Sequence, residues 1–94
     1  MKETNEISLH AVRVYRVLKE SRWLSAQEIA ALANIGRRTA RAYAKRFTDL
    51  GIVDVAELWP GHRYRLSASA AKRNHGFLQR LEQASEILGQ AATE

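Results

Sequence analysis

The chain has 94 residues, the size of one small domain, and 46% of them are hydrophobic, which is enough to build a core. It contains no cysteine, which excludes disulfides, thiolate metal sites and cysteine nucleophiles. The net charge of +5 lies almost wholly in residues 36–65, which carry seven Lys or Arg against three Asp or Glu. Such a concentration is typical of a surface that binds a polyanion, although a solvated basic face without a partner has the same composition.

The first expected helix covers residues 6–20. Its apolar residues recur at helical spacing and form one stripe: Ile7, Ala11, Val14, Tyr15 and Leu18. Leu9 and Val12 lie off this stripe, so we expect them to be either exposed or covered by a partner subunit.

A second helix is expected to begin at Ser25. Glu28 follows three residues later, which is the capping-box arrangement in which each side chain bonds the backbone N–H of the other residue. Leu24 and Ile29 flank this cap as a hydrophobic staple. Trp23, just before it, is expected to anchor the core or its edge rather than to stack on a base.

The third expected helix, residues 37–50, is the most basic part of the chain. It follows a turn at residues 34–36, where Asn and Gly tolerate positive φ, and Gly51 occupies its C-cap position. Its apolar residues form a stripe suited to a core: Ala40, Tyr43, Ala44, Phe47 and Leu50. Its basic residues lie between them: Arg37, Arg38, Arg41, Lys45 and Arg46. Two helices joined by a tight turn, the second of them basic, form a helix-turn-helix.

The segment 52–66 has the pattern of a β-hairpin. Its first half is rich in β-branched residues, a Pro-Gly turn follows, and its second half alternates strictly between basic and apolar residues. Arg63 and Arg65 therefore share one face of the return strand, while Tyr64 and Leu66 face the helices.

From residue 67 onward the chain is expected to be helical again, with a possible kink at Gly76 and an end near Gly89. Its apolar residues follow a heptad spacing: Phe77, Leu81, Ala84, Leu88 and Ala91. A lone helix with such a seam needs something to cover it, and a second copy of the chain is the favoured partner. The alternative is that the seam folds back on the chain's own core.

The segment from Leu24 to Leu66 resembles the winged helix-turn-helix family of prokaryotic transcription regulators. The resemblance is carried by Ser25-Ala26-Gln27-Glu28-Ile29-Ala30, the turn at Ile35-Gly36, Arg37-Arg38-Thr39-Ala40-Arg41, and Phe47-x-x-Leu50-Gly51-Ile52-Val53 with the hairpin that follows. It implies a mainly α (α+β) fold, with a winged helix-turn-helix domain at residues 6–66 and a C-terminal dimerisation helix at residues 67–91. Such domains often have Ser or Thr where this chain has Gly36, a residue that caps a helix nearly as well.

The resemblance also implies the function: a cytoplasmic, nucleoid-associated regulator that binds double-stranded DNA sequence-specifically. We expect a repressor that binds an inverted-repeat operator as a homodimer. Arg37, Arg38 and Arg41 would reach base edges or phosphates, since the planar fork of arginine suits guanine. Thr39 would contact a phosphate or a thymine methyl group.

The remaining expected contacts are with the DNA backbone and the minor groove. Lys45 and Arg46 would hold the backbone, and Arg63 at the wing tip would enter a minor groove, with Arg65 on the same face. Trp59 is expected to pack under the wing; the alternative is that it projects towards the DNA. Each of these basic side chains could instead be solvated or paired with a neighbouring carboxylate.

Two other functions stay open from the sequence. One is a DNA-binding adaptor in plasmid or phage partition or replication, and the other is a winged-helix module whose basic face binds an acidic protein. An enzyme is not expected, because the chain has no glycine-rich phosphate loop. A metal or other cofactor is not expected either, since His10, His62 and His75 fall in separate elements without carboxylates at ligand spacing. No membrane contact is expected, because no apolar run approaches the roughly 20 residues of a membrane span.

Overall fold

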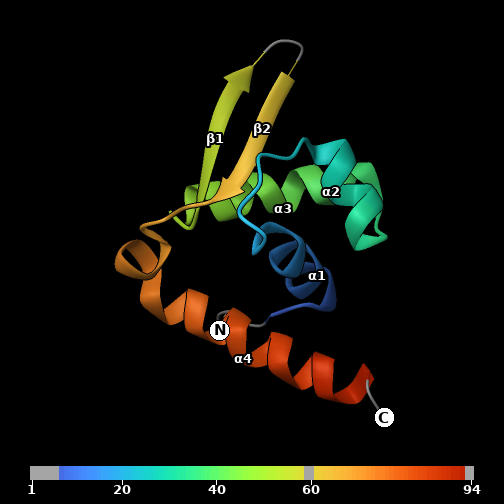
Figure 1. The fold of residues 1–94 in the computed structure, drawn as a ribbon, viewed down its shortest axis with the longest axis vertical. Coiled ribbons are helices and arrows are strands. Elements are labelled where there is room, and N and C mark those ends of the chain that lie inside the picture. Colours follow the sequence, from blue (N-terminus) through green and yellow to red (C-terminus); the bar gives the residue numbers. More distant parts are fainter. Residues whose placement is uncertain (1–6, 59–60, 93–94) are drawn as a thin grey trace, which may run out of the picture.

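The computed structural model describes residues 7–58 and 61–92, so the expectation for Trp59 lies outside the described residues. The elements follow one another in the order α1 (Leu9–Leu18), α2 (Ala26–Ala33), α3 (Arg37–Asp49), β1 (Val53–Leu58), β2 (Gly61–Leu66) and α4 (Ala70–Ala92). The hairpin projects from one side of the α1–α3 helices, and α4 runs across the opposite side (Figure 1). In the described part of the chain, no helix is long and apolar enough to cross a membrane.

Helix α1 is shorter than the expected span; it buries four of the five stripe residues, whereas Ile7 lies before the helix and is half-buried. The helix is capped by Ser8, whose hydroxyl accepts a hydrogen bond from the Ala11 N–H at 3.1 Å. Val12 is also buried within the chain, so it needs no partner subunit, whereas Leu9 is exposed. The stripe is part of a core to which α2, α3, the wing and α4 all contribute.

The helix-turn-helix confirms the local signals in the sequence. Ser25 accepts a hydrogen bond from the Glu28 N–H at 3.1 Å, and the Glu28 carboxylate accepts one from the Ser25 N–H at 2.8 Å. Asn34 ends α2 in the left-handed conformation, with φ of 58°, and Gly36 begins α3. Gly51 follows α3 with φ of 87°, the backbone conformation for which glycine was expected there.

The wing is an antiparallel hairpin whose pairing runs from Val53 with Leu66 to Leu58 with Gly61. A third segment, not expected from the sequence, adds to its base. The Leu24 N–H donates to the Tyr64 carbonyl at 2.9 Å, and the Tyr64 N–H donates back to the Leu24 carbonyl at 2.8 Å. This bridge joins the residue before the α2 cap to β2, so the start of α2 is held against the wing.

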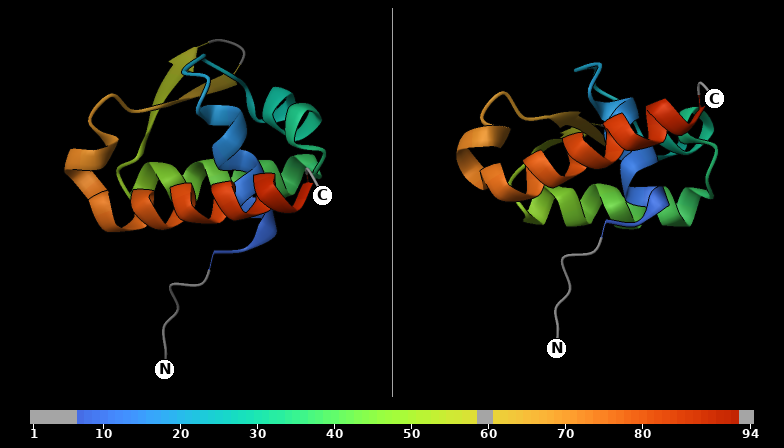
Figure 2. Two further views of the ribbon diagram at one scale, coloured as in Figure 1. Left: turned by 60° about the horizontal axis from the view of Figure 1, so that its bottom comes forward. Right: turned by 90° about the horizontal axis from the view of Figure 1, so that it is seen from below.

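Helix α4 packs on the chain's own core through part of its seam, so the expectation that a second copy covers Leu81 was wrong, while a dimer contact through the other seam residues stays a prediction. Leu81 is completely buried, and the Phe77 ring lies edge-on to Phe47 with centroids 5.8 Å apart. Ala84 and Leu88 are half-buried. Both views of Figure 2 show α4 crossing α1. Because α1 and α3 offer apolar surface in the same chain, Leu81 and part of Phe77 are covered without the entropy cost of association.

Two polar contacts fasten α4 to α1. The Tyr15 hydroxyl donates a hydrogen bond to the Glu82 carboxylate, and Lys19 Nζ lies 3.0 Å from the same carboxylate. The pKa of Glu82 is lowered mainly by the Tyr15 hydrogen bond and then by Lys19. The helix is interrupted at Asn74, with φ of −155° and ψ of 69°, rather than at Gly76, and it continues past Gly89.

Candidate nucleic-acid interface

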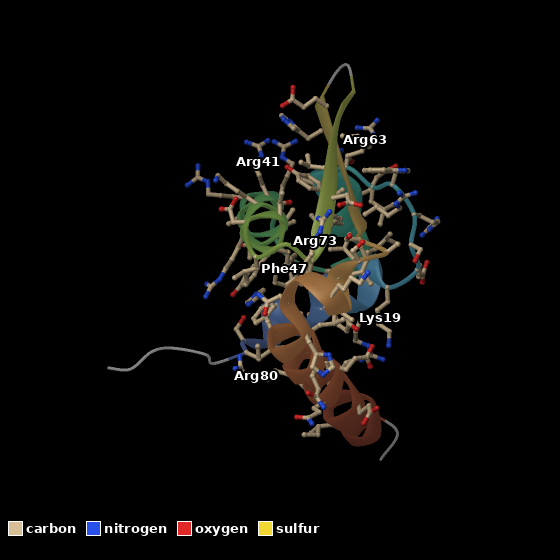
Figure 3. All side chains as sticks on the ribbon, turned by 90° about the vertical axis from the view of Figure 1, so that its left-hand side faces the viewer. Lys19, Arg41, Phe47, Arg63, Arg73 and Arg80 are labelled. Carbon is tan, nitrogen blue, oxygen red and sulfur yellow. The ribbon has the colours of Figure 1, made fainter. Side chains whose placement is uncertain are left out.

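An open groove of about 920 Å³ lies between α3, the wing and the start of α2. Four of the residues expected to contact DNA line it: Arg37, Arg41, Lys45 and Arg63. We call it the α3–wing groove. Figure 3 shows Arg41 and Arg63 at the hairpin end of the molecule, far from Arg80 on α4.

The buried stripe of α3 determines which of its basic residues reach this groove. Ala40, Ala44 and Phe47 are buried, which fixes the rotation of the helix about its axis. Arg37 and Arg41 are exposed, four residues apart, and therefore lie on one face. Lys45, four residues further on, continues that face towards the C-terminal end of the helix.

Three expected contact residues on α3 lie outside the groove. Arg38 and Arg46 are exposed, whereas Thr39 is half-buried. By helical geometry Thr39 and Arg46 point about 140° or more away from Arg41, whereas Arg38 points only about 60° from it and borders the groove face. The structure therefore does not bring these three together with Arg63, and their contacts with DNA stay predictions.

Two acidic residues line the groove at separate places, Asp49 at the C-terminal end of α3 and Glu57 near the tip of the wing. Asp49 lies 3.4 Å from Lys45 Nζ, and Glu57 lies 3.7 Å from His62 Nε2 on the wing. Both pairs are largely exposed, so each contributes little to stability, and Lys45 can exchange Asp49 for a phosphate. Among the described residues that line the groove, the arginines that form no ion pair are Arg37, Arg41 and Arg63.

Arg63 lies beside the α2 cap because the Leu24–Tyr64 bridge places Ser25 next to it across the sheet. The pKa of Glu28 is lowered chiefly by the hydrogen bond from the Ser25 N–H, and the charge of Arg63 adds to this effect. The wing arginine is therefore held near the first turn of α2, at the edge of the groove.

Arg65 does not join the groove. Its guanidinium carbon lies 4.3 Å from the centroid of the Trp23 ring, a cation–π contact between neighbours across the same bridge. Trp23 is 39% exposed, so it is not part of the buried core; its ring lies beside the wing and is covered by Arg65. This contact gives Arg65 a structural role that alternation along the strand did not predict, and its contact with DNA stays a prediction.

Gln27 is a groove residue that the sequence reasoning missed. It is exposed in the first turn of α2 and lines the groove together with Ser25, which had been explained by capping alone. The N-terminus of a helix favours anions, so this position suits a phosphate group. The sequence signal that could have identified Gln27 is its position at the start of the helix that directly precedes the basic helix. Among the described residues, no group of three or more His, Cys, Asp and Glu could hold a metal ion.

Comparison with known proteins gives a clear result for the fold. No protein-family model and no curated protein sequence matches the chain. A MarR-family transcriptional regulator from Silicibacter pomeroyi superposes with a TM-score of 0.64 and 13% identity, covering 89% of this chain and 58% of that one. A MarR-family regulator from Silicibacter pomeroyi DSS gives a TM-score of 0.62 and 15% identity, covering 95% of this chain and 71% of that one.

A third solved structure, NadR in complex with 4-hydroxyphenylacetate, gives a TM-score of 0.59 and 24% identity. The match covers 94% of this chain and 68% of that one. In these comparisons the present chain thus spans between 58% and 71% of its structural neighbours. The likeness extends over α4 as well as the helix-turn-helix and wing, since it covers most of the chain. The chain therefore has a winged helix-turn-helix fold similar to that of the MarR-family transcriptional regulators.

Proposed function

We propose that this protein is a sequence-specific double-stranded DNA-binding regulator, a repressor that acts by occupying a promoter. The observation that carries the proposal is the α3–wing groove, in which Arg37, Arg41 and Lys45 from α3 meet Arg63 from β2. The fold supports it, because two of the structural neighbours are transcriptional regulators. The residues that carry the excess charge of the sequence are thus presented together by the elements that bind DNA in winged helix-turn-helix proteins.

The geometry suggests how a duplex would be held. Helix α3 enters the major groove with its N-terminal turns nearest the bases, so Arg37 and Arg41 reach base edges and Lys45 reaches the backbone. The sugar–phosphate strand that borders the DNA major groove then lies in the α3–wing groove of the protein. Arg63 and the start of α2, with Gln27, then contact its phosphates or the adjacent minor groove. Asp49, at the C-terminal end of α3, would repel phosphates there and so keep the strand at the N-terminal half of the helix.

We propose further that two copies bind an inverted repeat. In a two-fold dimer the recognition helices meet successive major grooves, roughly 34–36 Å apart. Since Leu81 is used inside the chain, the contact between copies must involve other residues. Ile87 is the most exposed large apolar residue described on α4, at 67%, so Ile87→Asp is the variant to examine. Sedimentation should give a dimeric mass for the wild type and a lower mass for the variant, whereas a monomeric wild type would contradict the dimer.

Selection of bound duplexes from a random pool tests the proposal. We expect enrichment of one motif arranged as an inverted repeat. Enrichment of short motifs in long direct arrays would favour a partition or replication adaptor instead. A pool that stays random, together with capture of an acidic protein by the basic face, would contradict DNA recognition.

A further inference from the structure

We propose that Asn74 is a positioning residue that sets the orientation of the recognition helix relative to α4. This inference rests on the proposed function, because recognition helix here means α3 bound to DNA. Asn74 has non-helical backbone angles that interrupt α4, and its side chain reaches the end of α3. It does not line the α3–wing groove.

The amide of Asn74 uses both of its ends. Its Nδ2 donates a hydrogen bond to the backbone carbonyl of Leu50, the C-cap residue of α3, at 3.2 Å. Its Oδ1 accepts a hydrogen bond from the Phe77 N–H at 3.4 Å, which caps the second part of α4. Carbonyls at the end of a helix lack partners within that helix, so Asn74 satisfies one that would otherwise need water. One side chain therefore ends α3 and begins the long part of α4.

Contacts on both sides of Asn74 reinforce this joint. Arg73 Nη1 lies 3.5 Å from Asp54 Oδ1 on β1, which links the same turn of α4 to the wing. Phe77 packs edge-on against Phe47 inside α3. A Cβ atom at Gly51 would lie only 3.3 Å from the Arg73 Cβ, so the turn between α3 and β1 approaches α4 closely. The joint thus touches the end of α3, the turn and the first strand of the wing.

The rest of α4 is anchored independently of this joint. Leu81 is buried in the core, and Glu82 is bonded to Tyr15 and Lys19 of the α1 region. Asn74 therefore connects α3 to a helix that is itself fixed on the body. Reading of base edges depends on the placement of α3 to within about half an ångström, whereas phosphate contacts tolerate more movement. Loss of the joint should reduce discrimination between sequences more than general affinity for DNA.

The variant Asn74→Asp removes the hydrogen-bond donor of the amide and keeps an acceptor. The carboxylate keeps an acceptor for the Phe77 N–H but cannot donate to Leu50, and it places a negative charge against that carbonyl. Gln83→Glu is the matched control, because it makes the same amide-to-acid change at an exposed position of α4. Affinities for the selected duplex and for a scrambled duplex of equal length are measured for wild type and both variants, with a thermal unfolding curve for each.

We expect Asn74→Asp to reduce the ratio of the two affinities by about tenfold, the factor that corresponds to about 1.4 kcal/mol. The salt dependence of binding should match that of Gln83→Glu, and Gln83→Glu should keep the wild-type ratio. A variant that melts earlier but keeps the wild-type ratio would show that Asn74 is merely structural and would overturn the proposal. If Asn74→Asp does not fold, Asn74→Ser replaces it with the same expectations, since serine caps a helix but is too short to reach Leu50.

A second measurement needs no DNA and so separates this inference from the proposed function. The chain has no cysteine, so spin labels at Ala42→Cys on α3 and Gln79→Cys on α4 report one distance by pulsed electron paramagnetic resonance. The distribution should be single and narrow with Asn74 present, and shifted or broadened with Asn74→Asp. An unchanged distribution overturns the positioning role. A wild type with the narrow distribution but no affinity for any duplex overturns the proposed function, and with it the role in DNA reading.

Discussion

Replacement of Leu81 by alanine should lower the free energy of unfolding by about 2–5 kcal/mol, the usual cost of truncating a buried leucine. The side chain is completely buried on the face of α4 that packs against the core, so little relaxation is available to fill the space. A domain of this size has only about 5–15 kcal/mol of total stability. Each kcal/mol corresponds to about 4–8 °C, so the midpoint of thermal unfolding should fall by at least about 8 °C.

Thermal unfolding followed by circular dichroism at two protein concentrations measures this effect. Leu32→Ala is the matched control, because it makes the same leucine-to-alanine change on α2 at a position that is 55% exposed. That control should change the free energy of unfolding by no more than about 0.5 kcal/mol if the exposed residue packs on nothing. If the seam joined two copies instead, Leu81→Ala would lower the mass in sedimentation and leave the unfolding of the monomer nearly unchanged. That pair of results would refute the packing of α4 on its own chain.

Three further predictions concern the interface and the polar contacts. Arg41→Ala should weaken binding to the selected duplex by about 1–3 kcal/mol in a titration and reduce the discrimination between that duplex and random DNA. Arg16→Ala, which changes an exposed residue of α1, should do neither. An equal loss of affinity on random DNA would instead show that Arg41 contacts a phosphate. Ser25→Ala should cost about 1 kcal/mol in chemical unfolding, because the Ser25 hydroxyl accepts the cap hydrogen bond from the Glu28 N–H, and no loss would contradict this half of the capping box. The folded pKa of Glu82 lies below its ordinary value of 4.5, so its stabilisation is present above that pH and is lost as the pH falls through the lower folded value. Glu82→Gln should therefore flatten the fall of stability with acid in unfolding experiments below about pH 4.5, and an unchanged profile would contradict the Tyr15–Glu82 contact.

The elements that sequence reasoning located well are those whose cause lies within a few residues. The capping box at Ser25, the left-handed Asn34 and the positive φ of Gly51 all follow from the chemistry of one turn. The buried stripe of α3 follows from helical spacing, which also assigned Arg37 and Arg41 to the outside. Local rules were sufficient to predict the helix-turn-helix and the side of the α3–wing groove that α3 forms.

The features that were missed depend on residues far apart in the chain. A heptad seam has the same appearance whether it faces a second copy or its own core, so the burial of Leu81 could not be deduced from spacing. Arg65 meets Trp23 only because Leu24 bridges to Tyr64. Asn74 has no periodic signal at all, since its amide acts on a carbonyl 24 residues earlier. In each case the partner is supplied by the tertiary structure.

The most direct test of the account is the salt dependence of wild-type binding to the selected duplex, measured by fluorescence anisotropy. The α3–wing groove predicts tight binding at low salt and a logarithm of affinity that falls linearly with the logarithm of salt concentration. The slope should be about −0.9 for each phosphate neutralised by a basic side chain. The absence of measurable duplex binding at low salt would contradict the central claim that α3 and the wing form a DNA-binding surface.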